Sequence, residues 1–92
     1  MRRRAIALMR DPRHSATALG VLLPGLEECE LAISDCDLST RAFNCLGRAG
    51  IELWGELSSW RIASLEELRG AGVGTVDEIT LEVVRFWAES QL

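Results

Sequence analysis

A run of alternating glycines, Gly70, Gly72 and Gly74, separates two helical patterns in the second half of this sequence. Glycine adopts backbone conformations that other residues avoid, so the run predicts a tight turn that can approach another surface closely. Thr75, followed three residues later by Glu78, is typical of a capping box that opens a helix. The unpaired amides at such a helix start suit a phosphate, although a purely structural turn also fits these residues.

The same glycines suggest a dinucleotide-binding loop, but their surroundings argue against that reading. In its dinucleotide setting the motif follows a β-strand. Here residues 65–69 form a helical pattern, and no β-branched run precedes the glycines. The sequence therefore favours a turn between two helices.

Length and cysteine content narrow the class of protein. The chain has 92 residues, which fits one domain with a modest core, and no apolar stretch is long enough to span a bilayer. The apolar run after the first arginines ends at Arg10 and Asp11, which argues against a secretory signal. Three cysteines cannot all pair within one chain, and His14 is the only histidine. We expect neither a disulfide framework nor a metal site, and a cytoplasmic, nucleoid-associated protein that has no membrane contact.

The sequence contains no constellation that predicts catalysis. His14 has no positioned nucleophile beside it, and Cys45 has no base nearby in its motif. The carboxylates are scattered over helix faces that we expect to be solvated. We therefore expect no enzymatic activity and no cofactor.

Charge is unevenly distributed along the chain. Residues 1–14 carry five arginines against one aspartate, whereas residues 15–37 carry five acids and no arginine. Residues 38–92 carry five arginines and eight acids, and there is no lysine. A basic arm on an acidic body can follow nucleic acid, fold back onto its own acidic segment, or remain a solvated, disordered terminus.

We divide the chain into residues 1–36, a basic arm and acidic linker that is partly disordered or packed on the domain, and a helical domain of residues 37–92. Residues 15–23 fit either a short helix or an extended segment, and residues 27–37 a linker. Beyond residue 37 the pattern predicts four helices and no strand. Ser39 caps a helix that ends near Arg48 and is stopped by Gly50. The others are residues 53–59, residues 65–69 opened by a capping box of Ser64 and Glu67, and residues 76–90.

Helical spacing divides the first of these helices into two faces. The expected core face consists of Ala42, Phe43 and Leu46. The other face carries a basic and amide stripe of Arg41, Asn44, Cys45 and Arg48. Arginine binds phosphate or enters a minor groove, and asparagine contacts base edges or sugars, so the stripe has the chemistry to bind nucleic acid. A simple solvated helix face is the alternative.

The remaining large apolar residues fit a core. Trp54, Trp60, Phe86 and Trp87 interleave with leucine and valine at helical spacing, which favours burial over base stacking. The last helix carries a second apolar stripe of Leu81, Val84 and Ala88. We expect residues 19–26 or a partner protein to cover that stripe.

Several of these motifs together resemble one known family. The segments are Leu38-Ser39-Thr40-Arg41-Ala42-Phe43-Asn44-Cys45-Leu46, Gly50-Ile51, Gly55-Glu56-Leu57, Leu65-Glu66-Glu67-Leu68, Gly72 and Asp77-Glu78-Ile79. In order and spacing they are similar to the C-terminal domain of the bacterial RNA polymerase alpha subunit, over about residues 37–87. The resemblance implies a compact all-α domain of four helices with two helix-hairpin-helix-like units. It also implies binding to the minor groove of A/T-rich promoter DNA and contact with RNA polymerase, sigma factors or regulators.

The resemblance also assigns roles to single residues. Arg41 matches the arginine that enters the minor groove, Asn44 and Cys45 match neighbours that contact the DNA backbone, and Gly72 matches the hairpin glycine. Thr75 stands where a serine at the final helix start meets phosphate. Gly74, by contrast, occupies a position where the family usually has a lysine, and Val73 one where a polar or basic residue is common.

The predicted DNA-binding residues are therefore Arg41, Asn44, Cys45, Arg48, Gly72, Gly74 and Thr75. Without the lysine, DNA binding is expected to be weaker than in the family unless the arginine-rich arm compensates. The alternative function is a protein-interaction module of the transcription machinery whose DNA binding is weak or lost.

Overall fold

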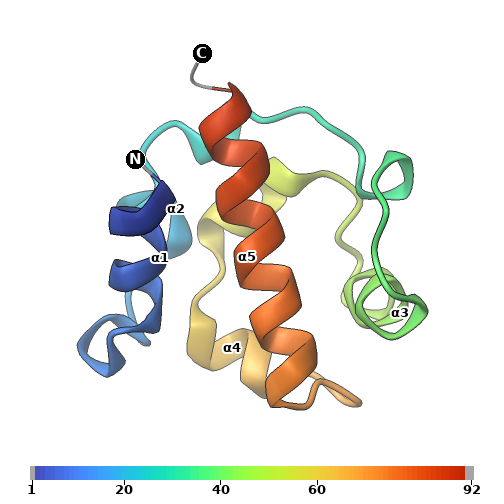
Figure 1. Ribbon diagram of the computed structural model, residues 1–92. Helices are drawn as coiled ribbons and strands as arrows, with labels where there is room; N and C mark the ends of the chain where they lie inside the picture. The colour runs from blue at the N-terminus through green and yellow to red at the C-terminus, as the bar shows by residue number, and fades with distance from the viewer. Residues whose placement is uncertain (1, 91–92) are drawn as a thin grey trace.

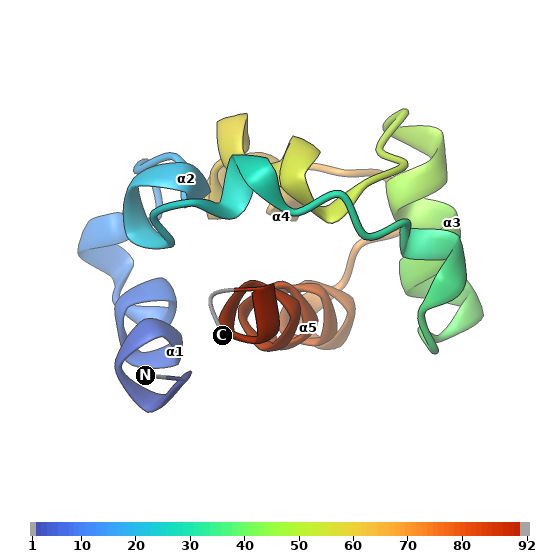
Figure 2. The same cartoon turned by 90° about the horizontal axis from the view of Figure 1, so that it is seen from above.

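The longest helix is α5 (Val73–Ser90), and the other elements flank it and cover one of its faces (Figures 1 and 2). The computed structural model describes residues 2–90, without the side chain of Arg2. Residue 1 of the predicted basic arm and residues 91–92 of the predicted helical domain lie outside the described residues. Within that range the shorter α-helices are α1 (Arg2–Arg10), α2 (Leu19–Leu22), α3 (Thr40–Arg48) and α4 (Ile62–Glu66). Short 3₁₀ helices cover Pro12–His14, Leu26–Glu28, Ile33–Asp35 and Trp54–Ser59.

The all-α prediction is confirmed. No strand occurs between residues 2 and 90, where the extended pairing is limited to two isolated bridges, Ala18 with Arg61 and Ala32 with Leu53. Both bridges join the first 36 residues to the helical region that follows. Two views of the molecule at right angles place α1 and α3 on opposite flanks of α5 (Figures 1 and 2).

Of the five aromatic residues, the three tryptophans and Phe86 belong to the core, as predicted. Trp54 is fully buried, and its ring stacks on Phe86 with centroids 5.3 Å apart. The indole N–H of Trp54 donates to Sγ of Cys36 at 3.2 Å, so the buried donor is satisfied. Trp87 is also buried, while Trp60 and Phe86 are partly buried and pack against the same core.

The third predicted helix starts earlier than expected. The helix α4 begins at Ile62, not at residue 65, so Ser64 lies inside the helix and the capping box of Ser64 and Glu67 is wrong. The reason is tertiary: Arg61 is extended and bridges to Ala18, and the amide of Ala63 donates to the carbonyl of Ser15 at 3.0 Å. This pairing sets the helix start at Ile62, whose side chain is buried.

The last helix also starts earlier, at Val73 rather than residue 76. The carbonyl of Gly72 accepts the amide of Val76 at 3.0 Å, so the first helical turn already contains Gly74 and Thr75. The capping box of Thr75 and Glu78 is therefore wrong. Of the three alternating glycines only Gly70 has a positive φ, of +85°. The tight turn that the sequence predicted over all three glycines is therefore made at Gly70.

The basic arm packs on the domain as a helix. Ala5 and Met9, four residues apart on one side of α1, are buried in contact with the common core. A small pocket between the two helices is lined by Ile6, Met9 and Arg10 of α1 and by Thr80, Leu81 and Val84 of α5. In the second apolar stripe of α5, Val84 and Ala88 are buried, whereas Leu81 remains 38% exposed. The helix α1 lies against this stripe, which the sequence did not suggest. From the segment 19–26, Pro24 accepts the Trp87 indole N–H at 2.8 Å.

The acidic linker is anchored by apolar side chains. Leu26 and Ile33 are buried within the two 3₁₀ helices of this segment, while its glutamates stay exposed. Gly55 allows the linker to approach closely, because a Cβ on Gly55 would lie 2.6 Å from the carbonyl oxygen of Cys29. Its amide donates to that same carbonyl at 2.9 Å.

Candidate nucleic-acid interface

The helix α3 is held at both ends by local signals that the sequence predicts. Ser39 is the N-cap, and its Oγ accepts the amide of Ala42 at 3.2 Å. At the other end Gly50 has φ +77°, and the amide of Ile51 donates back to the carbonyl of Leu46 at 3.0 Å. The predicted start and end of this helix are confirmed.

The two faces of α3 differ from the prediction at two residues. Cys45, expected on the exposed stripe, is 3% exposed, and Phe43, expected in the core, is 43% exposed. The buried face consists of Ala42, Cys45 and Leu46, which are three and four residues apart. These three side chains form the apolar stripe that α3 buries. Phe43 lies outside this stripe and is exposed to solvent.

The other three residues of the predicted basic and amide stripe lie on one exposed face of α3. Arg41, Asn44 and Arg48 are all exposed at i, i+3 and i+7, and we call these three residues the α3 stripe. Among the ion pairs formed within the described part of the protein, none involves Arg41 or Arg48. Their guanidinium groups therefore form no ion pair with a carboxylate of residues 2–90.

The glycine turn lies against α3. The thiol of Cys45 donates to the carbonyl of Arg69 at 3.8 Å, which ties the helix to the start of the turn. The position that a Cβ would take on Gly70 is 3.5 Å from Nη1 of Arg48 and 3.9 Å from Sγ of Cys45. The structure thus brings the α3 stripe and the turn together, and Cys45 is part of their packing.

The start of α5 offers backbone groups rather than polar side chains. Gly72 precedes the helix and has no side chain to cap it, and Gly72, Val73 and Gly74 are exposed. The first amides of a helix have no intrahelical acceptor. Thr75, in contrast, is only 6% exposed, so its hydroxyl is not presented as the sequence suggested. A Cβ on Gly72 or Gly74 would meet nothing within 4 Å.

Glu78 is a residue of this region whose contact the sequence did not reveal. Its carboxylate accepts the amide of Ser39 at 2.8 Å and the hydroxyl of Ser39 at 2.6 Å. The sequence suggested that Glu78 would pair with Thr75, three residues earlier. In the structure the partner of Glu78 is Ser39, at the start of α3. Glu78 therefore sets the position of α3 relative to α5.

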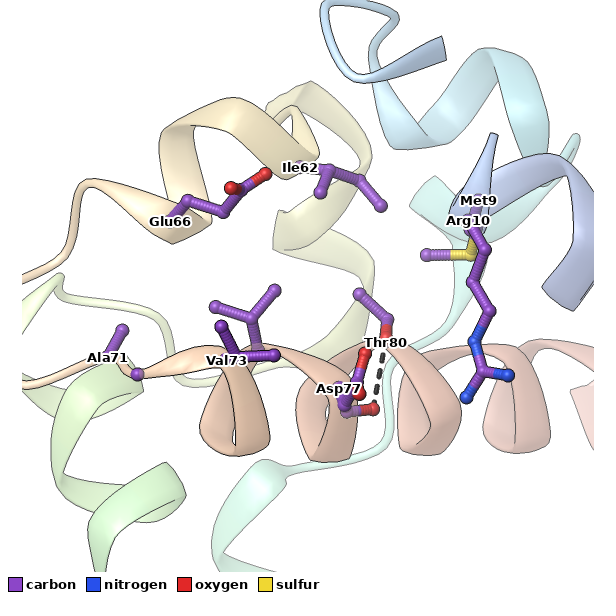
Figure 3. A pocket seen from close by; sticks show the side chains of 10 residues that line it. Met9, Arg10, Ile62, Glu66, Ala71, Val73, Asp77 and Thr80 are labelled. Carbon is purple, nitrogen blue, oxygen red and sulfur yellow. Dashed lines mark hydrogen bonds between the residues drawn. The ribbon is translucent and has the colours of Figure 1, made fainter. Parts of the chain in front are cut away.

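A pocket of about 550 Å³ lies beside the turn, between α1, α4 and α5 (Figure 3). Ala71 and Val73 lie at one end and Arg10 at the other, with Asp77 between Val73 and Arg10 in this view. Glu66 adds a second carboxylate to the lining, and Met9 and Ile62 make it partly apolar. Asp77 thus lies between the glycine turn and Arg10 of α1.

Comparison with known sequences identifies the family. The family model for the C-terminal domain of the bacterial RNA polymerase alpha subunit matches residues 24–83, which is more than half of the sequence. The protein belongs to this family. The match begins after α1 and α2, so the basic helix lies outside the matched residues and the α3 stripe and the glycine turn lie within them.

Several full-length relatives carry the same domain. The DNA-directed RNA polymerase subunit alpha of Saccharopolyspora erythraea is 43% identical over 54 residues, which cover 59% of this chain and 15% of that protein. The corresponding subunit of Arthrobacter sp. (strain FB24) is 36% identical over 74 residues, covering 80% of this chain and 20% of that protein. The subunit of Limosilactobacillus reuteri is 37% identical over 54 residues, 59% of this chain and 17% of that protein.

This alpha C-terminal domain protein therefore spans a fifth or less of the length of these curated relatives. No solved structure matches it significantly. Among the helices of residues 2–90, none is both long enough and apolar enough to cross a membrane.

Proposed function

We propose that this alpha C-terminal domain is a non-catalytic DNA-binding module of bacterial transcription that contacts the minor groove of A/T-rich DNA. It acts at the nucleoid, in the cytoplasm, together with RNA polymerase, a sigma factor or a regulator. The observation that carries the proposal is the closeness of the α3 stripe to the glycine turn: a Cβ on Gly70 would lie 3.5 Å from Nη1 of Arg48. Family membership supports the same function, because the relatives are subunits of a DNA-directed RNA polymerase.

In this proposal the side chains of the α3 stripe make the first set of contacts. Arg41 enters the narrow minor groove of an A/T tract, where the negative potential is enhanced. Asn44 bonds to sugar or base-edge oxygens, and Arg48 binds a phosphate beside the turn. Cys45 contributes by packing, since its thiol is committed to the carbonyl of Arg69.

The turn supplies the second set of contacts. The amides of Gly74 and Thr75 in the first turn of α5 donate to one phosphate, favoured by the positive end of the helix dipole. Gly72 has no side chain to block that approach. The threonine hydroxyl takes no part, because Thr75 is buried.

A titration with A/T-rich and G/C-rich duplexes tests the proposal. With the A/T-rich duplex at low salt we expect amide shift changes at Arg41, Asn44, Gly72 and Gly74, and weaker changes with the G/C-rich duplex. Arg41→Ala is expected to weaken A/T binding and reduce the preference, while Arg61→Ala, an exposed arginine outside the stripe, serves as the control. Unchanged amide shifts, together with an Arg41→Ala variant that binds like the parent, would exclude the groove contact.

The alternative function, a protein-interaction module with weak DNA binding, is favoured by one observation of its own. Phe43 is exposed beside a pocket of about 370 Å³ that is lined by residues including Ile33, Ile51 and Leu53. An exposed aromatic next to an apolar pocket is typical of a protein contact. If this is the function, Phe43→Ser lowers affinity for purified RNA polymerase or sigma factor, whereas Arg41→Ala does not.

A further inference from the structure

The pocket of about 550 Å³ beside the glycine turn has an apolar floor. Met9, Ile62 and Val76, one each from α1, α4 and α5, line this floor and are buried. Thr80 is a buried polar residue of the lining, and its hydroxyl donates to the backbone carbonyl of Asp77 at 3.0 Å (Figure 3). The volume falls within the range of about 300–1,000 Å³ that is typical of small-molecule sites. The pocket therefore has the size and the lining to hold an apolar group.

Charged side chains surround the apolar floor. Arg10 of α1, Glu66 of α4 and Asp77 of α5 all line the pocket and are exposed. Asp77 lies between the glycine turn and Arg10, and Glu66 lies on the neighbouring helix α4 (Figure 3). The pocket thus has a negative part, made by two carboxylates, and a positive part, made by one guanidinium.

These charged groups have no ion-pair partner within the described part of the chain. None of the ion pairs among the side chains of residues 3–90 includes Arg10, Glu66 or Asp77. Arg10 and Asp77 line one pocket and carry opposite charges, yet they do not pair with each other. Both groups are therefore available to a ligand that carries charges of both signs.

The pocket depends on the packing of α1 against the rest of the domain. Met9 and Arg10 of α1 form one side of it, and Arg10 supplies its positive charge. The helix α1 ends before residues 24–83, which match the family model. Family membership therefore does not account for this pocket.

We propose that this pocket binds a small zwitterion with an apolar body, of the class of short apolar peptides. The free amine of the peptide lies at Asp77 and Glu66, its free carboxylate lies at Arg10, and its side chains lie on the apolar floor. A peptide separates its amine from its carboxylate by several bonds, which suits charged groups that do not reach each other. An anion without an amine, such as a nucleic-acid phosphate, would meet two carboxylates in the same pocket.

A titration of the whole protein with leucyl-leucine, in the absence of DNA, tests the site. We expect saturable NMR shift changes at the amides of Gly72 and Val73 and at the methyl group of Met9, all of which line the pocket. The amide of Asn44 should not change, because α3 lies on the other flank of α5 (Figures 1 and 2). No saturable change at the pocket residues, up to the solubility limit of the peptide, overturns the proposal. Since no DNA is present, this result is independent of the groove contact proposed above.

Removal of one charge from the peptide tests how it is oriented. N-acetyl-leucyl-leucine lacks the amine and leucyl-leucine amide lacks the carboxylate, so each is expected to bind about 1.5- to 5-fold more weakly, the range of an exposed ion pair. The variant Asp77→Asn/Glu66→Gln should weaken leucyl-leucine by a similar factor without weakening the N-acetyl peptide. Arg10→Gln should likewise weaken leucyl-leucine but not its amide. Equal affinity of all three peptides for the wild-type protein overturns the proposal, since apolar contact alone would then account for binding.

Two matched variants control for the change in net charge. Asp35→Asn/Glu27→Gln removes the same two types of acid at exposed positions outside the pocket, and Arg3→Gln removes an exposed arginine of α1 that does not line it. Both variants should bind leucyl-leucine like the wild-type protein. Thermal unfolding of each variant checks that the helices around the pocket stay packed. If the control variants weaken binding as much as the pocket variants do, the proposal fails, because net charge rather than the pocket would then set the affinity.

Discussion

The carboxylate of Glu78 accepts both the amide and the hydroxyl of Ser39, a residue 39 positions earlier in the sequence. Ser39 in turn caps α3 by accepting the amide of Ala42. One glutamate on α5 thus orients the N-cap of α3, and it links the two helices that form the candidate interface.

Replacing Glu78 by alanine is expected to destabilise the fold and loosen the start of α3. Loss of two acceptors at a partly exposed site should lower the free energy of unfolding by about 1 kcal/mol. Denaturant unfolding measures this loss, and amide exchange at Ala42 reports the cap. Glu82→Ala is the control, because Glu82 pairs with Arg85 only at the surface, at 3.4 Å, and should cost less. Equal losses in the two variants would mean that the Ser39 contact adds nothing.

The packing of α1 on α5 can be tested at Met9. This side chain is buried between the helices, so Met9→Ala is expected to lower the free energy of unfolding by about 2–5 kcal/mol. Val21→Ala also shortens an apolar side chain, but Val21 is 69% exposed and should change stability by less than about 0.5 kcal/mol. Chemical denaturation compares the two, and a neutral Met9→Ala would show that α1 is not docked in solution.

A positive charge at position 74 is expected to strengthen DNA binding. Gly74 has open space around its missing Cβ, so Gly74→Lys fits without strain and places an ammonium beside the proposed phosphate site. One added phosphate contact should make the salt slope steeper by about 0.9. Fluorescence anisotropy at several salt concentrations measures the slope. Gly74→Gln adds a side chain of similar reach without charge, and a steeper slope in both variants would point to a conformational effect.

The pKa of Asp11 provides a test of the turn after α1. The side-chain hydrogen bonds from Arg13, followed by the Arg13 amide, lower the pKa of Asp11 from 3.8 to about 2. Since the folded pKa is depressed, the stabilising contact is fully present above about pH 3.8 and is lost as the pH falls through about 2. An NMR titration of the Asp11 carboxyl should show the low value, and Arg13→Gln should return it toward 3.8. Arg85→Gln, distant in sequence, should leave it unchanged.

Much of α3 could be predicted because its signals are local. Ser39 and Gly50 mark the two ends of the helix through contacts that span only a few residues. The buried and exposed faces of α3 were harder to assign. Phe43 and Cys45 are both apolar, and they lie on opposite sides of the line from Ala42 to Leu46, so either could have been the buried one. Their burial depends on what packs against the helix: the thiol of Cys45 meets the carbonyl of Arg69, 24 residues further along the sequence, whereas Phe43 lies beside a surface pocket.

The helix starts at residues 62 and 73 could not be predicted from capping motifs. A bridge to Ala18 fixes the first start, and Gly72 allows the second without a side-chain cap. Ser64 and Thr75 therefore lie inside helices although each has a glutamate at the right spacing. A capping motif states only that a helix can start there, while long-range pairing decides where it does.

The sequence by itself determined the helical class, the core aromatic residues, the bounds of α3 and the arginines of its exposed face, because periodicity and short-range hydrogen bonds encode these features. Tertiary structure alone decided that Glu78 reaches Ser39, that Cys45 packs under the glycine turn and that α1 lies against the second apolar stripe of α5. These contacts join residues far apart in the sequence. Which of these contacts form depends on how the apolar faces of several helices pack together. A single segment of the sequence does not contain that information.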